Sequence, residues 1–557
     1  MLLLLLSYIY IFITCSVTGK FVSNKLGLFF SNPTLYTCIG IVSITSLARI
    51  WALFSGIGWL FQCVLLVFTV LAYFANRKSD NSDLSLLTVF KKHPLLISVA
   101  TVFILFFSAQ QTISYDEGLY HASFIEWMNQ YGYVKGLANL HGRLAFNSSW
   151  HLFSSVFNWR FLSDQPFNQV NGFFCITILL YFLIERELHS DNNSIKTFTG
   201  LAIAFLLFPL LSIYHVIDPS ADYVIVFWTL LMLYELYFYE EKGRNSAIIT
   251  FLCSSAVYLL TVKLSSVILL SSFLLYLKER KSQPVNMVVA ITICLIITVP
   301  YLVSNYILSG YIIYPYLNIS SVAPIWKVPA AIAQHEIIGI KYSPFERWIH
   351  TDMNTIATLS MVEKYTLFFK AIRLPEKLIF ITAIVTAVVN LINCFIPSRS
   401  NTYKKYAVIV SVLGLAMVIL SAPDVRFAAG YIFFSYIIFI LSFAGKVKLP
   451  ELVVGGFFLV SALASLALYR HLKKLAPMYA SVDSPANKST LSFSLLTPEP
   501  YPITAPDSTM SLRGQKFYLF EEAKGHFHWN TIPAMYTPAK EISLIDSTNI
   551  RSGFRAK

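Results

Sequence analysis

The 557-residue chain has few charged residues: Asp, Glu, Lys and Arg make up 13% of it, whereas hydrophobic residues make up 56%. Soluble globular proteins carry about 25% charged and about 45–50% apolar residues. The mean hydropathy is +0.63, so a soluble globular protein is excluded. The sequence also lacks a glycine-rich phosphate loop, a GxSxG elbow and an HExxH helix. ATPase, serine hydrolase and zincin activities are therefore without support.

The cysteines lack the spacing of a metal site or a disulfide framework. All seven fall inside apolar runs, with no CxxC pair and no nearby ligand histidine, so we interpret them as small core residues. The net charge of +13 is spread over short connections and the C-terminal tail. It forms no basic and aromatic cluster of the kind that follows a nucleic acid, so no nucleic-acid partner is expected.

Long apolar runs dominate the chain. Runs of about 20 residues indicate transmembrane helices, because barrel strands need only about 10 alternating residues. We therefore predict an all-α fold, a polytopic bundle of about fourteen spans in residues 1–469 with interfacial helices outside, followed by a small outside tail in residues 470–557. The predicted spans run near residues 2–17, 35–53, 56–74, 95–107, 167–184, 198–216, 223–239, 247–260, 264–277, 285–308, 378–396, 406–420, 427–443 and 452–469.

Basic residues predict the orientation, because cytoplasmic connections are enriched in Lys and Arg. With the N-terminus outside, every cytoplasmic connection is basic, including those with Arg77 and Lys78, with Lys242 and Arg244, and with Lys404. Both termini then lie outside. Arg470, Lys473 and Lys474 at the start of the tail disagree with this orientation, but long segments translocate despite their charge. The unusual polar motifs all fall on the outside face.

The first long polar interruption runs from Ser114 to Trp150. Asp116 and Glu117 follow an apolar run there, and adjacent residues on a helix diverge by about 100°, so they cannot share one proton as a dyad. One could face a reacting centre while the other positions substrate or a metal ion. A carboxylate at this boundary can accept the proton of an acceptor hydroxyl, and we assign that role to Asp116. A plain solvated loop is the alternative. His121, Arg143 and His151 lie in or just after the same connection.

Three cations end apolar helices on the outside face: Arg143, Lys263 and Arg426. A charged side chain in that position costs free energy unless it is ion-paired or hydrated, so it either binds a ligand or reaches the lipid head groups. We predict that these cations hold the phosphate of a lipid carrier. Arg426 is the strongest candidate because Pro423 and Asp424 in APDVRF predict a rigid turn that pairs it with an acid.

Other polar residues admit two interpretations each. His121 and His151 could bind a phosphate or a metal ion, or could be hydrogen-bonded structural residues. Asp218 and Asp222 surround Ser220; the two carboxylates could bind substrate, or the turn could serve only to cap the next helix through Ser220. The loop 309–376 is rich in aromatic residues and proline, which suits interfacial helices that dock a lipid chain or a sugar, or only anchor the protein. The sequence does not identify a cofactor, and a divalent cation is possible.

The segments DEGLYHASFIEW, FNSSWH, DPSADY, VKLSS, SGYIIYP, APDVRF and RSGF resemble a family of bacterial multispan membrane proteins treated as GT-C-like. More broadly, the acidic pair and the many spans resemble the GT-C superfamily of glycosyltransferases that use polyprenyl-phosphate-linked sugars. That superfamily usually carries its acidic motif after the first span, whereas Asp116 follows about the fourth.

The resemblance implies an inverting glycosyltransferase in the bacterial inner membrane. Asp116 would activate an acceptor hydroxyl on an envelope glycan or glycolipid, and the lipid phosphate would leave. Two alternatives remain at this stage: a transporter or flippase for a lipid-linked glycan, and a polysaccharide polymerase or ligase. A transporter would line its midplane with polar residues or broken helices, whereas here the polar motifs gather at one face and Arg49 is one of few charges within a span.

Overall fold

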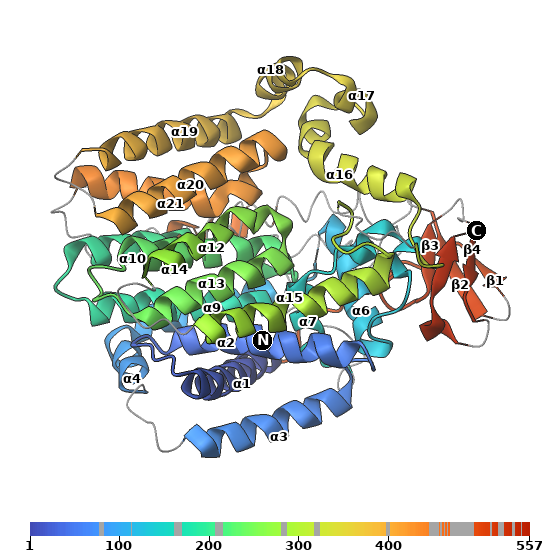
Figure 1. Ribbon diagram of the computed structural model, residues 1–557, viewed down its shortest axis with the longest axis horizontal. Helices are drawn as coiled ribbons and strands as arrows, with labels where there is room; N and C mark the ends of the chain where they lie inside the picture. The colour runs from blue at the N-terminus through green and yellow to red at the C-terminus, as the bar shows by residue number, and fades with distance from the viewer. Residues whose placement is uncertain are drawn as a thin grey trace.

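The computed structural model of the chain is mostly helical (Figure 1). It describes residues 1–76, 83–112, 114–160, 170–206, 216–279, 287–316, 323–396, 401–444, 495–512, 515–521, 528–536, 541–546 and 549–556, together with scattered positions between 456 and 470. The predicted span 452–469 lies largely outside the described residues.

The helices follow the chain in four groups. The first group is α1 (Leu2–Leu26), α2 (Thr34–Ala52), α3 (Trp59–Asn76), α4 (Asp83–Lys92) and α5 (Pro94–Ser108). The polar stretch folds as the π-helical turn η1 (Glu117–His121), α6 (Ala122–Gln130), the 3₁₀ turns η2 (Leu137–Asn139) and η3 (Gly142–Ala145), and α7 (Ser149–Val156). The third group is α9 (Val170–Leu188), α10 (Asn193–Phe205), α12 (Ala221–Tyr237), α13 (Ser246–Val262), η4 (Leu264–Ser271), α14 (Ser272–Glu279) and α15 (Met287–Ser309). The last group is α16 (Ala330–Ile349), α17 (Met353–Thr358), α18 (Met361–Ala371), α19 (Leu374–Cys394), α20 (Thr402–Ser421) and α21 (Val425–Ala444).

Seven described helices are long and apolar enough to cross a membrane: α1, α2, α3, α15, α19, α20 and α21. The pair α4 and α5, bent by 94° at its break, brings the count to eight if it forms one span. The chain is therefore a helical protein compatible with a membrane, but the predicted number of about fourteen spans is not confirmed.

Several helices at predicted spans fall outside that set of seven. α12 and α13 have 17 residues each and are buried along nearly their whole length. α9 has 19 residues but carries the charged residues Glu185, Arg186 and Glu187 near its end. A helix surrounded by other helices is apolar on all sides whether or not it crosses a membrane, so hydropathy alone does not settle the number of spans.

Two glycines let α1 and α2 cross closely. A Cβ atom on Gly19 would come within 1.8 Å of the Tyr36 carbonyl oxygen, and one on Gly40 within 1.8 Å of the Cys15 carbonyl oxygen. Small residues at such a crossing allow the two backbones to approach closely. Close packing of this kind stabilises helix pairs in lipid, where the hydrophobic effect does not drive helices together. This crossing forms one wall of the bundle on which the polar stretch rests.

The C-terminal tail adds short strands to a fold predicted to be all-α. β1 (Ser508–Leu512) and β2 (Gln515–Phe520) form an antiparallel hairpin, and β3 (Ala534–Tyr536) pairs with β2 in parallel. β4 (Ile542–Leu544) and β5 (Phe554–Ala556) form a separate antiparallel pair. Figure 1 shows these strands gathered at one end of the helical bundle, next to α6.

The tail is tied to that end by backbone hydrogen bonds. The Phe554 amide donates to the Lys135 carbonyl oxygen over 2.9 Å, and the Glu499 amide donates to the Ala109 carbonyl oxygen over 2.8 Å. Gly136 is required at the contact, because its φ is +64° and a Cβ there would lie 2.1 Å from the Phe554 carbonyl oxygen. The tail therefore packs on the polar stretch.

Candidate functional site

The polar stretch after α5 is a compact helical connection and not an open loop. Its backbone enters through the π-helical turn η1, which carries Glu117 and His121, and leaves through α7, which carries His151. Single π-helical turns are rare and occur often at functional sites. Most side chains along the connection are buried, so its charged groups must find partners inside the protein.

The exposed carboxylate of the stretch is that of Asp116. Its Oδ1 accepts a hydrogen bond from Arg143 Nη1 over 2.8 Å, and 40% of the Asp116 side chain is exposed. Arg143 also lies 3.7 Å from Glu336 Oε2 on α16 and above the Tyr120 ring. Burial lowers the pKa of Arg143, but Asp116, Tyr120 and Glu336 outweigh that effect and raise it. Arg143 therefore stays charged beside Asp116.

Glu117 is the buried member of the acidic pair. One of its oxygens accepts a hydrogen bond from the Tyr501 hydroxyl of the tail, and the other lies 3.1 Å from His121 Nδ1. The Glu117 side chain is fully buried. The two adjacent carboxylates thus have different surroundings, and Asp116 is the one that a substrate could reach.

His151 lies against His121, with 4.2 Å between the two ring centroids. Within the described part of the chain, its buried Nε2 has no hydrogen-bond partner. Burial lowers the pKa of His151 well below its ordinary value, and the nearby charges of His121 and Lys263 lower it further, whereas Asp222 opposes them. The imidazole is therefore neutral near pH 7 and keeps an acceptor nitrogen or an N–H donor available for a ligand.

A second ion-paired group comes from three other connections. Asp222, in the first turn of α12, accepts a hydrogen bond from Lys263 at the end of α13. Its other oxygen lies 4.0 Å from Arg426 Nη1, at the start of α21. One carboxylate therefore holds two cations. The Phe427 ring packs under both of them, 3.7 Å from Lys263 Nζ and 5.3 Å from Arg426 Cζ.

The turn before α21 fixes Arg426 as its sequence indicates. Asp424 accepts hydrogen bonds from the Arg426 amide over 2.9 Å and from Arg426 Nε over 3.2 Å. Arg347 of α16 lies 3.7 Å from the same carboxylate. Burial alone would raise the pKa of Asp424, but the charges of Arg426 and Arg347 outweigh it and lower the pKa. The turn is thus held by an ionised carboxylate.

Asp218 precedes α12 and lies within reach of the charges of Glu117 and Asp116. It accepts a hydrogen bond from the Ser220 amide over 3.1 Å, and Ser220 in turn caps α12, as its place in the sequence predicts. Burial raises the pKa of Asp218 well above its ordinary value, and the charge of Glu117 raises it further. A carboxyl group in that state can stay protonated and donate a hydrogen bond.

The two groups belong to one cluster at one end of the bundle. The charges of Asp116 and Asp222 both act on the Arg426 guanidinium, and both also act on the Tyr120 hydroxyl. The structure therefore brings together all the candidate residues of the sequence: Asp116, Glu117, His121, Arg143, His151, Asp218, Asp222, Lys263 and Arg426. Their roles in a reaction remain predictions.

Sequence reasoning missed two residues of this region and the partners of a third. Glu336 and Tyr501 reach Arg143 and Glu117 from segments far along the chain, and no local motif marks them. Arg49 was visible as a charge within a span, but its partners were not. It is 2% exposed and donates to Asn147 Oδ1 over 2.8 Å and to Ser149 Oγ over 2.7 Å. Its side-chain hydrogen bonds thus link α2 to the polar stretch.

The described residues show no arrangement that is typical of a metal centre. In that part of the chain, no group of three or more His, Cys, Asp or Glu side chains is arranged to hold a metal ion. The arrangement instead offers cations for an anionic group, an accessible carboxylate and a neutral imidazole. These groups suit the binding and transfer of a phosphate-linked substrate.

The fold and the site define a mostly helical protein with several apolar helices of membrane-spanning length and an ion-paired cluster at one end of its bundle. The chain matches the family model described as "Domain of unknown function (DUF8201)" over residues 1–433 of 557, and it belongs to that family. All nine candidate residues fall within the matched segment. No curated protein and no solved structure matches the chain.

Replacing Tyr501 by Phe is expected to destabilise the protein by about 1–3 kcal/mol, because it removes the hydrogen bond that the Tyr501 hydroxyl donates to the buried Glu117 side chain. Denaturation of the purified protein in detergent would measure the change. Tyr73→Phe is the matched control, since Tyr73 lies on α3 with 57% of its side chain exposed. Equal stability of the two variants would show that the tail contributes nothing to holding Glu117.

Proposed function

We propose that this protein is a membrane glycosyltransferase that moves a sugar from a polyprenyl-phosphate-linked donor to an envelope glycan or glycolipid acceptor. The proposal places it in the bacterial inner membrane as a multispan protein, with both termini and the cluster on the outer face. The observation that carries it is that one end of the bundle combines the accessible carboxylate of Asp116 with three cations drawn from separate connections.

The chemistry follows from those groups. The acceptor hydroxyl oxygen would attack the anomeric carbon of the sugar, and the bond from that carbon to the phosphate oxygen would break. The proton of the hydroxyl would pass to Asp116, and Lys263 and Arg426 would stabilise the negative charge left on the lipid phosphate. Attack opposite the departing phosphate inverts the anomeric centre. Neither step requires a metal ion when cations already face the phosphate.

The electrostatics of the cluster support donor binding. Lys263 and Arg426 share Asp222, while Asp424 also pairs with Arg426. A lipid phosphate could approach the same pair and gain charge-assisted hydrogen bonds. The planar guanidinium of Arg426 is already oriented by Asp424, which reduces the entropy that binding would cost.

Envelope glycans from cells with and without the gene would test this proposal. Loss of one sugar branch, restored by the wild-type gene, is the expected result. Shortened chains with unchanged branches would instead favour a polymerase or ligase. Accumulation of a complete lipid-linked glycan on the inner leaflet would favour a flippase. Unchanged glycans, together with no transfer by the purified protein from polyprenyl-phosphate sugars, would refute the proposal.

A further inference from the structure

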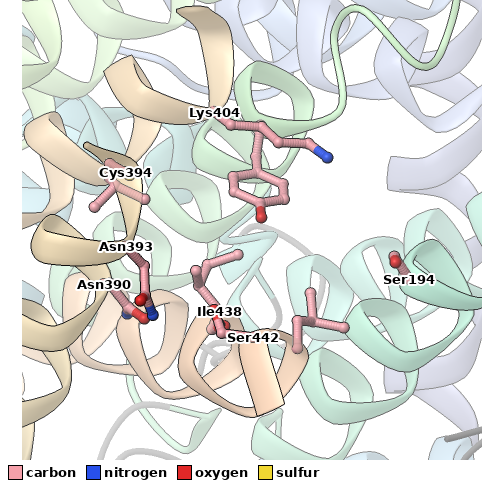
Figure 2. A pocket seen from close by; sticks show the side chains of 10 residues that line it. Ser194, Asn390, Asn393, Cys394, Lys404, Ile438 and Ser442 are labelled. Carbon is pink, nitrogen blue, oxygen red and sulfur yellow. The ribbon is translucent and has the colours of Figure 1, made fainter. Parts of the chain in front are cut away.

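A polar pocket lies at the other end of the bundle from the cluster. It is bounded by α10, α19, α20 and α21 and by Tyr237, the last residue of α12, whose first turn carries Asp222. Its volume is about 230 Å³, which is smaller than the pockets of about 300–1,000 Å³ that hold drug-sized ligands and suits a small group such as a lipid head group. Figure 2 shows the amide groups of Asn390 and Asn393 on one side of this pocket and Ser194 across from them.

The Asn390 side chain has one polar atom without a hydrogen-bond partner among the described residues, its Oδ1. The side chain is 3% exposed, and its Nδ2 donates to the Ser435 carbonyl oxygen over 2.8 Å. Its buried Oδ1 has no partner in the part of the chain that the structure describes. An unsatisfied buried acceptor costs about 1–3 kcal/mol. A ligand in the pocket that Asn390 lines could satisfy this oxygen if the ligand carries a hydrogen-bond donor.

Cations lie at one side of the pocket. The Lys404 ammonium pairs with Glu241 and lies over the Tyr237 ring, 5.2 Å from its centroid. The charge of Lys405 also acts on Cys394 of the lining. An occupant with an anionic group and an N–H donor could place its anion against Lys404 and its donor toward Asn390.

An apolar surface adjoins the polar pocket. Ile438 and Leu441 form part of its wall. Beside the pocket, Ile392 on the last turn of α19 and Phe395 just after that helix are 60% and 69% exposed. Exposed apolar side chains next to a polar cavity suit an amphiphile, because the acyl chains can cover the helix while the head group enters the cavity.

We propose that this pocket binds the head group of a zwitterionic phospholipid that carries N–H donors, of the phosphoethanolamine type. Its ammonium group donates to Asn390 Oδ1, and its phosphate faces Lys404. Phosphocholine has the same net charge but lacks the N–H donors, and phosphoglycerol has donors but carries a net negative charge. The three head groups therefore separate the contribution of the donor from that of charge. The inference does not depend on the transferase proposal.

Native mass spectrometry of the purified full-length protein, titrated with short-chain phosphatidylethanolamine, phosphatidylcholine and phosphatidylglycerol, tests this proposal. Phosphatidylethanolamine is expected to bind about tenfold more tightly than phosphatidylcholine, since one hydrogen bond of about 1.4 kcal/mol corresponds to tenfold in affinity. Equal affinities for the three lipids would overturn the proposal and leave a water-filled pocket. Tighter binding of phosphatidylglycerol would overturn the assigned head group.

Two variants link the preference to this pocket. Asn390→Leu removes the acceptor and should abolish the preference for phosphatidylethanolamine. Because Asn390 also joins α19 to α21, a second variant is needed that leaves this contact in place. Ser442→Trp fills the pocket from an exposed position on α21 and should have the same effect. Leu378→Trp adds the same side chain to a half-exposed position near the start of α19, about 18 Å along the helix from Asn390, and should leave the preference unchanged. A preference that survives Ser442→Trp would refute the assignment.

Discussion

Replacing Asp116 by Asn is expected to lower the rate of sugar transfer by about 10²–10⁴-fold, the usual contribution of a positioned general base. Asparagine keeps the shape of the side chain and can still accept a hydrogen bond from Arg143, but it cannot take the acceptor's proton. The fall should therefore appear in kcat, with donor binding nearly unchanged. Transfer from a labelled polyprenyl-phosphate sugar by the purified variant would measure it.

The chain offers a matched control for this substitution. Glu240 follows the far end of α12, pairs with Arg244 and is 35% exposed, compared with 40% for Asp116. α12 has 17 residues, so its ends lie about 25 Å apart. Glu240→Gln should leave transfer unchanged. Full activity in the Asp116→Asn variant would exclude Asp116 as the base and leave Glu117, Asp218 and Asp222 as the next candidates.

The local parts of the cluster could be predicted from sequence because they depend on neighbouring residues. Ser220 caps the helix that begins after it, and Asp424 pairs with Arg426 two residues later. Both features follow from turn and cap chemistry. The gathering of polar motifs on one face was also readable, because the ends of antiparallel helices meet at one end of a bundle however far apart they lie in the chain.

Long-range pairings could not be predicted in the same way. Tyr501 donates to Glu117 from 384 residues away, and Asp222 joins Lys263 to Arg426 across three connections. Nothing in one sequence states which charges will meet. The number of spans could not be counted from sequence for a related reason. A helix buried among other helices, such as α12 or α13, is as apolar as one that faces lipid, so hydropathy does not distinguish them. The tail's strands are three to six residues long, too short for a clear alternating pattern.

Replacing Arg426 by Ala is expected to weaken donor binding as well as turnover, with a fall in kcat/KM of about 10²–10³-fold. The guanidinium would contact the lipid phosphate before the sugar leaves and would stabilise the charge that develops as it leaves, so KM for the donor should rise while kcat falls. The kcat/KM of Arg426→Lys should lie between those of the wild type and Arg426→Ala, because lysine keeps the charge but loses the planar fork of the guanidinium.

Arg347→Ala separates this role from a general effect on the turn before α21. Arg347 lies 3.7 Å from the same Asp424 carboxylate that holds Arg426, but 56% of its side chain is exposed, so its removal should change donor affinity little. Binding of polyprenyl phosphate to each purified variant, measured beside the kinetics, would distinguish the two. If Arg347→Ala weakened donor binding as much as Arg426→Ala, the effect would come from the Asp424 turn, and a direct contact between Arg426 and the phosphate would be excluded. A loss confined to Arg426→Ala, partly recovered in Arg426→Lys, would place the lipid phosphate beside the two cations that Asp222 holds.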